Sequence, residues 1–225
     1  MDMMAEIERL AGLVKDKGLR RKVLDVIANP SIELEYPSLP LEECPAGAYQ
    51  HHSYAGGLLQ HTIAVTKLSL TLCDLMEEVY GGKVDRDVVV AGALLHDVMK
   101  CYTYTPSGEG GYISSRLGEQ VDHLTLLVAE LYRRGFPVDV IHVAASHHGD
   151  VSPVKPKSVE ALIVSIADLA DSELSRRTLR AAEYLLRQAG EARPRINSSQ
   201  EALDVVEAKK KDGWGGVKKL VDGED

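Results

Sequence analysis

Apolar residues recur at helical spacing along most of the chain. Near the N-terminus Ile7, Leu10 and Val14 share one helix face, and Val23 and Val26 continue the pattern in the next segment. The same period of three and four residues predicts further helices over residues 54–80, 87–100, 119–134, 137–148, 158–173 and 175–190. The pattern therefore predicts an all-α bundle.

Two stretches interrupt this helical pattern. Residues 30–50 carry four prolines, of which Pro30 ends the second helix, and we expect them to wrap irregularly over the core. Residues 101–118 are rich in tyrosine and glycine and predict a loop or short hairpin insertion. Because the insertion follows the helix over 87–100, for which Asp85 or Asp87 is the expected cap, it is a candidate for the lip of a site and for substrate selectivity.

The domain organisation that follows is simple. Residues 1–195 are expected to form one helical domain, and residues 196–225 a polar tail. A short helix near 199–211 is compatible with the tail's composition. We expect the lysines at 209–211 and the last residues to be solvated or frayed.

Composition narrows the class of protein. The 225 residues are 44% hydrophobic and 27% charged, which is ordinary for a soluble globular protein. A formal net charge of −8 argues against a broad surface for duplex nucleic acid, but not against a small phosphorylated ligand. The sequence holds no apolar run of about 18 residues, as a membrane span needs, and no secretory core. Because Cys44, Cys73 and Cys101 are widely spaced and odd in number, we expect reduced thiols and a cytoplasmic protein; a homo-oligomer stays open.

The adjacent pair His96-Asp97 lies near the end of an apolar segment. Burying it is expensive unless a charged partner compensates, and a metal ion is such a partner. Other histidines and one further aspartate fall in or beside apolar helices, which gives as candidate ligands His61, His96, Asp97, His123, His147, His148 and Asp168. Helical bundles often build metal sites from several helices in this way. Imidazole and carboxylate ligands without thiolates suit Fe, Mn, Co, Ni or Zn and favour a catalytic site.

Each candidate has an alternative explanation. The set His61, His96, Asp97 and Asp168 could be a polar core whose groups satisfy one another. His123, His147 and His148 could contact a phosphate beside a single ion, and Asp171, one turn after Asp168, could replace it as ligand. Three further residues are candidates for substrate contact, although each could also be structural or solvated: His52, Lys100 and Arg116. His51 and His142 are expected at the surface.

The ordered motif His61 … His96-Asp97 … Asp168 resembles that of the HD-domain superfamily of metal-dependent phosphohydrolases, over roughly residues 50–175. The matching segments are Gly56–Thr62, Ala93–Lys100 and Ile166–Asp168. The resemblance implies a helical HD core and places Lys100 on the substrate phosphate. His123 and Ser146–Gly149 resemble the two-metal branch. By that resemblance His61, His96, Asp97 and Asp168 hold one ion, and Asp97, His123, His147 and His148 hold a second, with Asp97 as the bridge.

Two subgroups of the HD-domain superfamily resemble this sequence more closely, over residues 51–59 and 132–137. One comprises the archaeal HD phosphodiesterases of pterin biosynthesis, which open dihydroneopterin 2′,3′-cyclic phosphate. The other comprises bacterial HD 3′–5′ exoribonucleases, whose HD domain follows an OB-fold domain. Only about 50 helical-looking residues precede the first match here, which disfavours the exoribonuclease and favours a small substrate.

The expected function is therefore hydrolysis of a small phosphate ester, with a 2′,3′-cyclic phosphate opened to a phosphomonoester. The expected cofactor is one or two divalent transition-metal ions, Fe(II) or Mn(II) in preference to Zn, Co or Ni. A metal-bound hydroxide would attack phosphorus, with Asp97 orienting the water and Lys100 stabilising the phosphoryl charge. The alternatives are an exoribonuclease, a nucleotidase, and a non-catalytic HD regulatory module.

Overall fold

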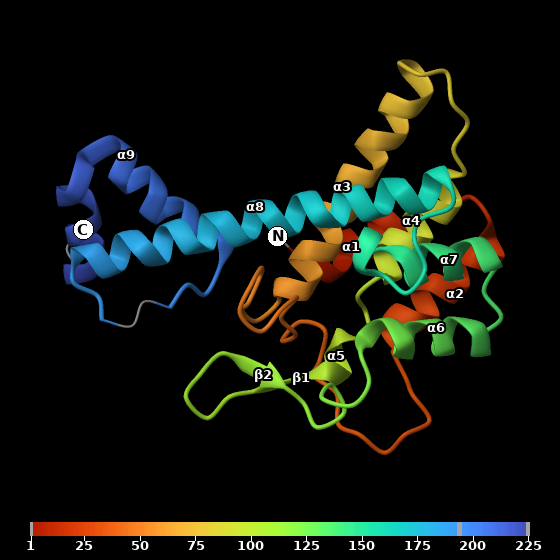
Figure 1. Ribbon diagram of the computed structural model, residues 1–225, viewed down its shortest axis with the longest axis horizontal. Coiled ribbons are helices and arrows are strands. Elements are labelled where there is room, and N and C mark those ends of the chain that lie inside the picture. The colour runs from red at the N-terminus through yellow and green to blue at the C-terminus, as the bar shows by residue number, and fades with distance from the viewer. Residues whose placement is uncertain (1, 193–194, 224–225) are drawn as a thin grey trace.

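The computed structural model describes residues 2–192 and 195–223, and its regular secondary structure is helical apart from one short hairpin (Figure 1). Its elements, in chain order, are α1 (Met3–Ala11), α2 (Lys17–Ala28), α3 (Gly57–Glu78), α4 (Arg86–Leu95), α5 (Lys100–Thr103), β1 (Tyr104–Pro106), β2 (Tyr112–Ser114), α6 (His123–Arg133), α7 (Val138–Ser146), a 3-10 helix (Gly149–Val151), α8 (Val159–Ala189) and α9 (Ser199–Asp222). The all-α prediction is confirmed. The described chain contains no helix long and apolar enough to cross a membrane.

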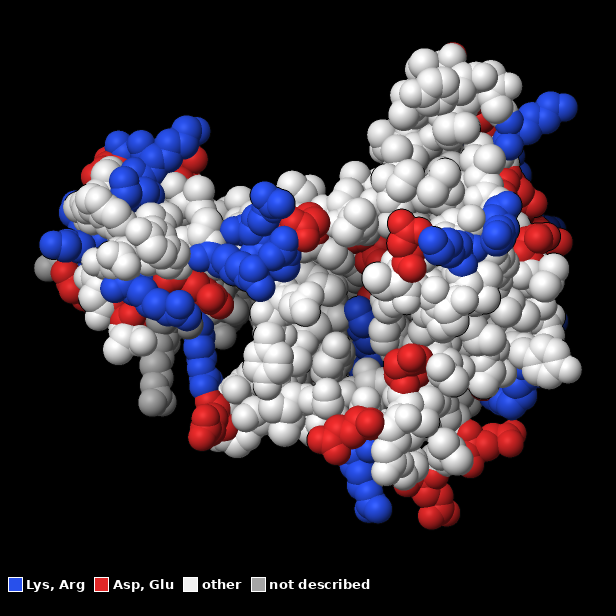
Figure 2. Space-filling view, in the orientation of Figure 1, with Lys and Arg blue, Asp and Glu red and all other residues white. Residues whose placement is uncertain are grey.

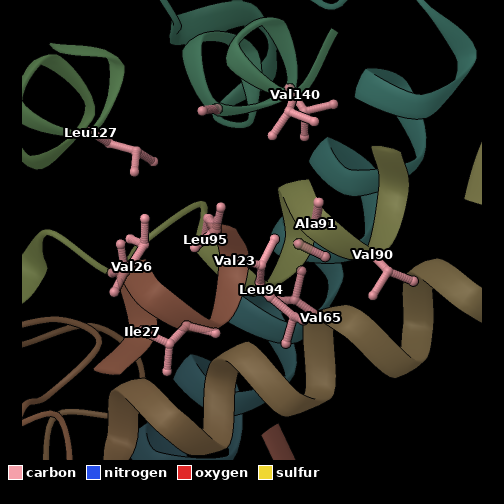
Figure 3. Packing of buried hydrophobic residues seen from close by; sticks show 14 of the residues in the cluster. Val23, Val26, Ile27, Val65, Val90, Ala91, Leu94, Leu95, Leu127 and Val140 are labelled. Carbon is pink, nitrogen blue, oxygen red and sulfur yellow. The ribbon is translucent and has the colours of Figure 1, made fainter. Parts of the chain in front are cut away.

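Helix α4 is the centre of the core. Every residue from Val88 to Leu95 is buried, and the helix packs against α1, α2, α3, α7 and α8. Figure 3 shows Val90, Ala91 and Leu94 of α4 among apolar side chains of the surrounding helices. Because one helix touches so many others, the end of α4 is the point where several elements meet. His96 and Asp97 follow directly on that end.

Local sequence signals set the ends of α4. The side chain of Asp85 accepts hydrogen bonds from the backbone N–H groups of Asp87 and Val88, so Asp85 is the N-cap. Asp87 instead binds the backbone N–H groups of Lys15 and Asp16, at 2.8 and 2.7 Å, and so ties the α1–α2 turn to α4. The predicted helix over 87–100 is corrected at its other end. It stops at Leu95, residues 96–99 form turns, and α5 starts at Lys100.

The insertion at 101–118 is a hairpin, as the sequence predicts. Strands β1 and β2 pair antiparallel, with Thr105 opposite Ile113, and the hairpin lies beneath the bundle in Figure 1. The irregular wrap of residues 29–56 ends at Gly56, whose φ of +77° is a left-handed conformation that glycine adopts without strain. The long helix α3 therefore starts at Gly57, three residues later than predicted.

The C-terminal third differs most from the sequence prediction. The two helices predicted over 158–173 and 175–190 are one continuous helix, α8, whose C-terminal half extends away from the bundle (Figure 1). The short helix predicted near 199–211 is longer. Helix α9 reaches Asp222, with a kink at Gly213, and packs Ala202, Val205 and Val217 in a second apolar cluster with α8. Basic side chains gather over this half of α8 and over α9 in Figure 2.

The close approach of α4 to α7 gives a testable prediction. A Cβ built on Gly92 would lie 2.4 Å from Cγ1 of Val143. We expect Gly92→Ala to lower the free energy of unfolding by about 1–3 kcal/mol, because a packed core must shift to accept the methyl group. Denaturant titration measures the change. Gly215→Ala is the control, since a Cβ there meets nothing within 4 Å. Equal unfolding free energies for Gly92→Ala and the unaltered protein would contradict the packing described.

Candidate metal centre

The predicted ligands converge at one buried place, although they come from five helices. His61 lies on the first turns of α3, His96 and Asp97 follow α4, and Asp168 lies on α8. His123 begins α6 after the N-cap Asp122, whose side chain accepts the backbone N–H of Thr125. His147 and His148 follow the last residue of α7. Each helix thus presents its side chains from an end or from an inward face.

The carboxylate of Asp97 lies between two groups of possible ligands. Its Oδ2 is 3.3 Å from Nε2 of His61 and 3.4 Å from Nε2 of His96. Its Oδ1 is 3.2 Å from Nε2 of His123 and 3.5 Å from Nε2 of His147. One oxygen therefore faces each group, as a bridging carboxylate requires.

Donor atoms within each group are close enough to share one ion. His61, His96 and Asp168 offer three such atoms within 4.8 Å of one another, and Asp97, His123, His147 and His148 offer four. Asp168 Oδ1 lies 3.1 Å from His61 Nε2. The second group contains the residues that the two-metal resemblance implies, whereas the first lacks Asp97, whose Oδ2 lies 3.3 Å from His61 Nε2 and 3.4 Å from His96 Nε2.

Hydrogen bonds fix which ring nitrogen of three histidines faces the centre. His96 Nδ1 lies 2.8 Å from the carbonyl oxygen of Ala93, and His147 Nδ1 lies 2.7 Å from that of Ala144. His61 Nδ1 lies 2.7 Å from Oδ2 of Asp171. A carbonyl or carboxylate can only accept here, so each Nδ1 carries a proton and each Nε2 faces the cluster, where it can bind an ion once it carries no proton. The neutral ring with its proton on Nδ1 is the tautomer that a metal-binding imidazole needs.

Several of these atoms lack the partners that burial normally demands. Asp97 Oδ1, His123 Nε2 and His147 Nε2 are buried and have no hydrogen-bond partner among the described residues. Leaving such an atom unpaired costs roughly 1–3 kcal/mol, and more when it is charged. A cation coordinated by all three removes that cost. The donor set therefore fits a metal ion, and its imidazoles and carboxylates fit a transition metal.

The electrostatics of the cluster also favour a cation. Burial alone would lower the pKa of His61, but Asp168, Asp171 and Asp97 outweigh it and raise that pKa well above its ordinary value. In the second group, burial lowers the pKa of His123, and it lowers the pKa of His148 to about 3. These rings are therefore neutral near pH 7, as ligands must be.

Lys100 is buried beside Asp97 and lines a cavity, and its contact with a substrate phosphate stays a prediction. Its Nζ lies 2.5 Å from Asp97 Oδ2, and the side chain is almost wholly buried. Burial would lower the pKa of this ammonium, but the Asp97 carboxylate raises it, so Lys100 is charged at neutral pH. The solvated surface lysine that the sequence left open is thereby excluded.

A cavity of about 790 Å³ opens beside the cluster. Lys100, His148 and Asp168 lie at its inner end, and Leu162 and Leu169 of α8 form an apolar part of its wall. Its size suits a small-molecule substrate.

Three expectations about individual residues change. His51, predicted at the surface, lines this cavity and lies 5.1 Å from the His61 ring, between ring centroids. His52 is buried and hydrogen-bonds Asp171 and Tyr54 rather than lining the cavity, which leaves its predicted substrate contact without support. Arg116 is exposed, and among the described residues it is not part of the cavity wall.

The hairpin is also not the lip of this cavity. Its residues Ser107, Tyr112 and Ile113 line a separate cavity of about 750 Å³ on the other side of the wrap. Tyr104, at the start of β1, is half-buried, and burial raises the pKa of its hydroxyl, so it is uncharged at neutral pH. The walls of the cavity come from α8, the 3-10 helix and His51 of the wrap instead.

Asp171 is the functional residue that sequence reasoning placed least well. Its one-turn spacing from Asp168 suggested a substitute ligand, but its carboxylate binds Nδ1 of His61, on the side of the ring away from Asp97. The sequence signal, two aspartates one turn apart on α8, fits either role. Only the direction of the His61 ring separates them.

Comparison with known proteins agrees with this geometry. The model of the HD-domain family matches residues 58–173. The dihydroneopterin 2′,3′-cyclic phosphate phosphodiesterase of Methanocaldococcus jannaschii is 43% identical over 213 residues, which cover 93% of this chain and 85% of the relative. The 3′–5′ exoribonucleases YhaM of Oceanobacillus iheyensis and Bacillus subtilis are 30% and 27% identical, and each match covers 58% of this chain and 43% of the relative.

No solved structure matches the chain significantly. The family match spans all four residues of the motif, His61, His96, Asp97 and Asp168, and it contains the two clusters described above. The chain belongs to the HD-domain family, as a metal-dependent phosphohydrolase.

Proposed function

We propose that this protein hydrolyses dihydroneopterin 2′,3′-cyclic phosphate, or a cyclic phosphodiester very like it, to a phosphomonoester. The observation that carries the proposal is the 43% identity to a phosphodiesterase of that name over 93% of this chain. The described site agrees with it, because a buried cluster of metal ligands and a charged lysine lie at the inner end of a cavity of substrate size.

The ligand set supports two divalent ions, one held by His61, His96, Asp97 and Asp168 and the other by Asp97, His123, His147 and His148. Fe(II) or Mn(II) is the proposed metal, since neither group contains a thiolate. Bound there, the metal supplies a water of lowered pKa and positive charge beside the phosphate. The three thiols are buried and unpaired, which supports a cytoplasmic location.

The chain's own groups have separate tasks. Lys100 donates to a non-bridging phosphoryl oxygen and stabilises the charge that grows there. The apolar wall of Leu162 and Leu169 covers one face of the heterocycle and holds the ester in place. The oxygen of water adds to phosphorus and one of the two ring P–O bonds breaks. The alkoxide that leaves takes up the proton that the water loses and becomes a free hydroxyl. The product keeps its phosphate on the other oxygen.

A substrate panel tests the proposal. Purified protein loaded anaerobically with Fe(II) or Mn(II) is given dihydroneopterin cyclic phosphate, 2′,3′-cyclic nucleotides, nucleoside monophosphates and short RNA. We expect the largest kcat/KM for the pterin cyclic phosphate. Faster degradation of RNA would favour the exoribonuclease instead, and no turnover of any ester would favour a regulatory module.

A further inference from the structure

A continuous set of hydrogen bonds connects a metal ligand to the C-terminal helix. His61 Nδ1 donates to Asp171 Oδ2 at 2.7 Å, and His52 Nε2 donates to the same oxygen at 2.8 Å. On its other side, His52 Nδ1 lies 2.8 Å from the Tyr54 hydroxyl. That hydroxyl lies 2.5 Å from Oγ of Ser199, the first residue of α9.

The group His52, His61 and Asp171 is a hydrogen-bonded support and not a third metal site. Two ligand atoms on one ion, each about 2.1 Å from it, lie about 3 Å or more apart in tetrahedral or octahedral geometry. The distances of 2.7 and 2.8 Å are those of N–H···O hydrogen bonds instead. His61 also has its Nε2 facing Asp97 and Asp168, so its Nδ1 is free to act as a donor.

The backbone holds His52 in an unusual conformation that serves this arrangement. Its φ is +42°, the one positive value among non-glycine residues in the described chain. The backbone N–H of His52 donates to Ser175 Oγ on α8 at 2.9 Å. A Cβ built on Gly57 would lie only 2.0 Å from the carbonyl oxygen of His52, so glycine is required at position 57. The ring of His52 is thus fixed against both α3 and α8.

Tyr54 takes part both in the set of hydrogen bonds and in the second apolar cluster. Its hydroxyl contacts His52, Ser199 and, at 2.6 Å, Oε1 of Gln60 on α3. Its ring packs in the second apolar cluster with Leu179 of α8 and Val205 of α9. Moving α9 would therefore remove both the packing and a hydrogen-bond partner of Tyr54. Among the described residues, neither the wall of the cavity beside the cluster nor the ligand set includes a residue of α9.

We propose that Asp171, His52 and Tyr54 are positioning residues that fix the ring of His61, and that Ser199 makes this depend on the docking of α9. The inference rests on the metal binding proposed above. Under this inference the docking of α9 affects metal binding at the first position, where His61 is a ligand. It does not affect metal binding at the second position. The effect of each residue should decrease with its distance from His61 along the hydrogen-bonded set.

The test is metal affinity in the full-length protein, measured with Co(II) by anaerobic titration against a chelator and by the visible spectrum of the bound ion. We expect Asp171→Asn to weaken the first position by about 10- to 100-fold and to change its spectrum. Tyr54→Phe, which deletes one hydroxyl, should weaken it about two- to tenfold, and Ser199→Ala should weaken it less than Tyr54→Phe does. The second position should be unchanged in all three.

Tyr49→Phe is the matched control, because Tyr49 is 75% exposed, and it should bind Co(II) like the unaltered protein. Thermal unfolding of each metal-free variant shows whether a loss of affinity is only a loss of stability. If Asp171→Asn and Tyr54→Phe fold and bind Co(II) at both positions with unaltered affinity and spectrum, the inference is wrong while the proposed function stands. Should Asp171→Asn fail to fold, the Co(II) affinity and spectrum of Tyr54→Phe alone test the inference, and unaltered values would contradict it. If the unaltered protein binds no metal, the proposed function fails and this inference with it.

Discussion

Asp97→Asn is expected to remove both metal ions and all measurable turnover together. Each oxygen of the Asp97 carboxylate faces a different group of ligands, with Oδ2 at 3.3 Å from His61 Nε2 and Oδ1 at 3.2 Å from His123 Nε2. An amide keeps the shape but replaces one oxygen by an N–H donor and removes the negative charge. The two groups then lose their shared ligand. Metal content by mass spectrometry and the rate of ester hydrolysis, measured on the same preparation, give the result.

The matched control for this variant is Asp25→Asn. Asp25 is exposed on α2, away from the cluster, so its variant should retain metal and activity. A folded Asp97→Asn protein that keeps two ions per chain would show that Asp97 is not the bridge. One that keeps activity without metal would contradict the assigned chemistry altogether.

Lys100→Met is expected to slow turnover about 10²- to 10³-fold while leaving the metal in place. This is the size of effect seen when one preorganised donor to a developing oxyanion is removed. Lys100 lines the cavity, and its charged Nζ is next to Asp97, but it is not itself a ligand. Methionine keeps most of the buried stem and deletes only the charge, so the fold should tolerate the change.

Steady-state kinetics and metal analysis of the Lys100 variant check this expectation. The loss should appear in kcat more than in KM if the lysine acts mainly on charge developed in the transition state. Lys17→Met, an exposed position at the start of α2, provides the control. A Lys100→Met enzyme with unaltered kcat would remove Lys100 from the chemistry.

The candidate ligands could be picked out from the sequence because their pattern is local to each helix, and that they bind a metal stays a prediction. His61, His96-Asp97 and Asp168 each occur in a segment that resembles a known motif, and the structure brings all of them together. The positions of the Asp171 and His51 side chains were harder to predict from the sequence. Whether an aspartate one turn from a ligand contacts the ion or a histidine depends on the direction of a ring on another helix. The wrap of residues 29–56, with its positive φ at His52, has no periodicity from which the inward position of His51 could be read.

The elements were predicted least well where tertiary contacts decide them. Asp85 caps α4, as its sequence context indicates, whereas α6 starts at His123 after the N-cap Asp122, four residues later than predicted. The continuity of α8 past residue 173 follows instead from its packing with α9, in a cluster that unites Leu179 with Val205. The turn after α4 is similar, because a regular helix through Asp97 was expected from propensity. The observed turns at 96–99 bring Asp97 between two groups of ligands that lie on different helices.

The central claim is that Asp97 joins two metal positions at the inner end of the cavity. Anomalous X-ray diffraction from crystals of the Mn(II)-loaded protein tests it most directly. We predict two anomalous peaks on either side of the Asp97 carboxylate, one near His61, His96 and Asp168 and the other near His123, His147 and His148. A single peak, or peaks elsewhere with none beside Asp97, would contradict the account.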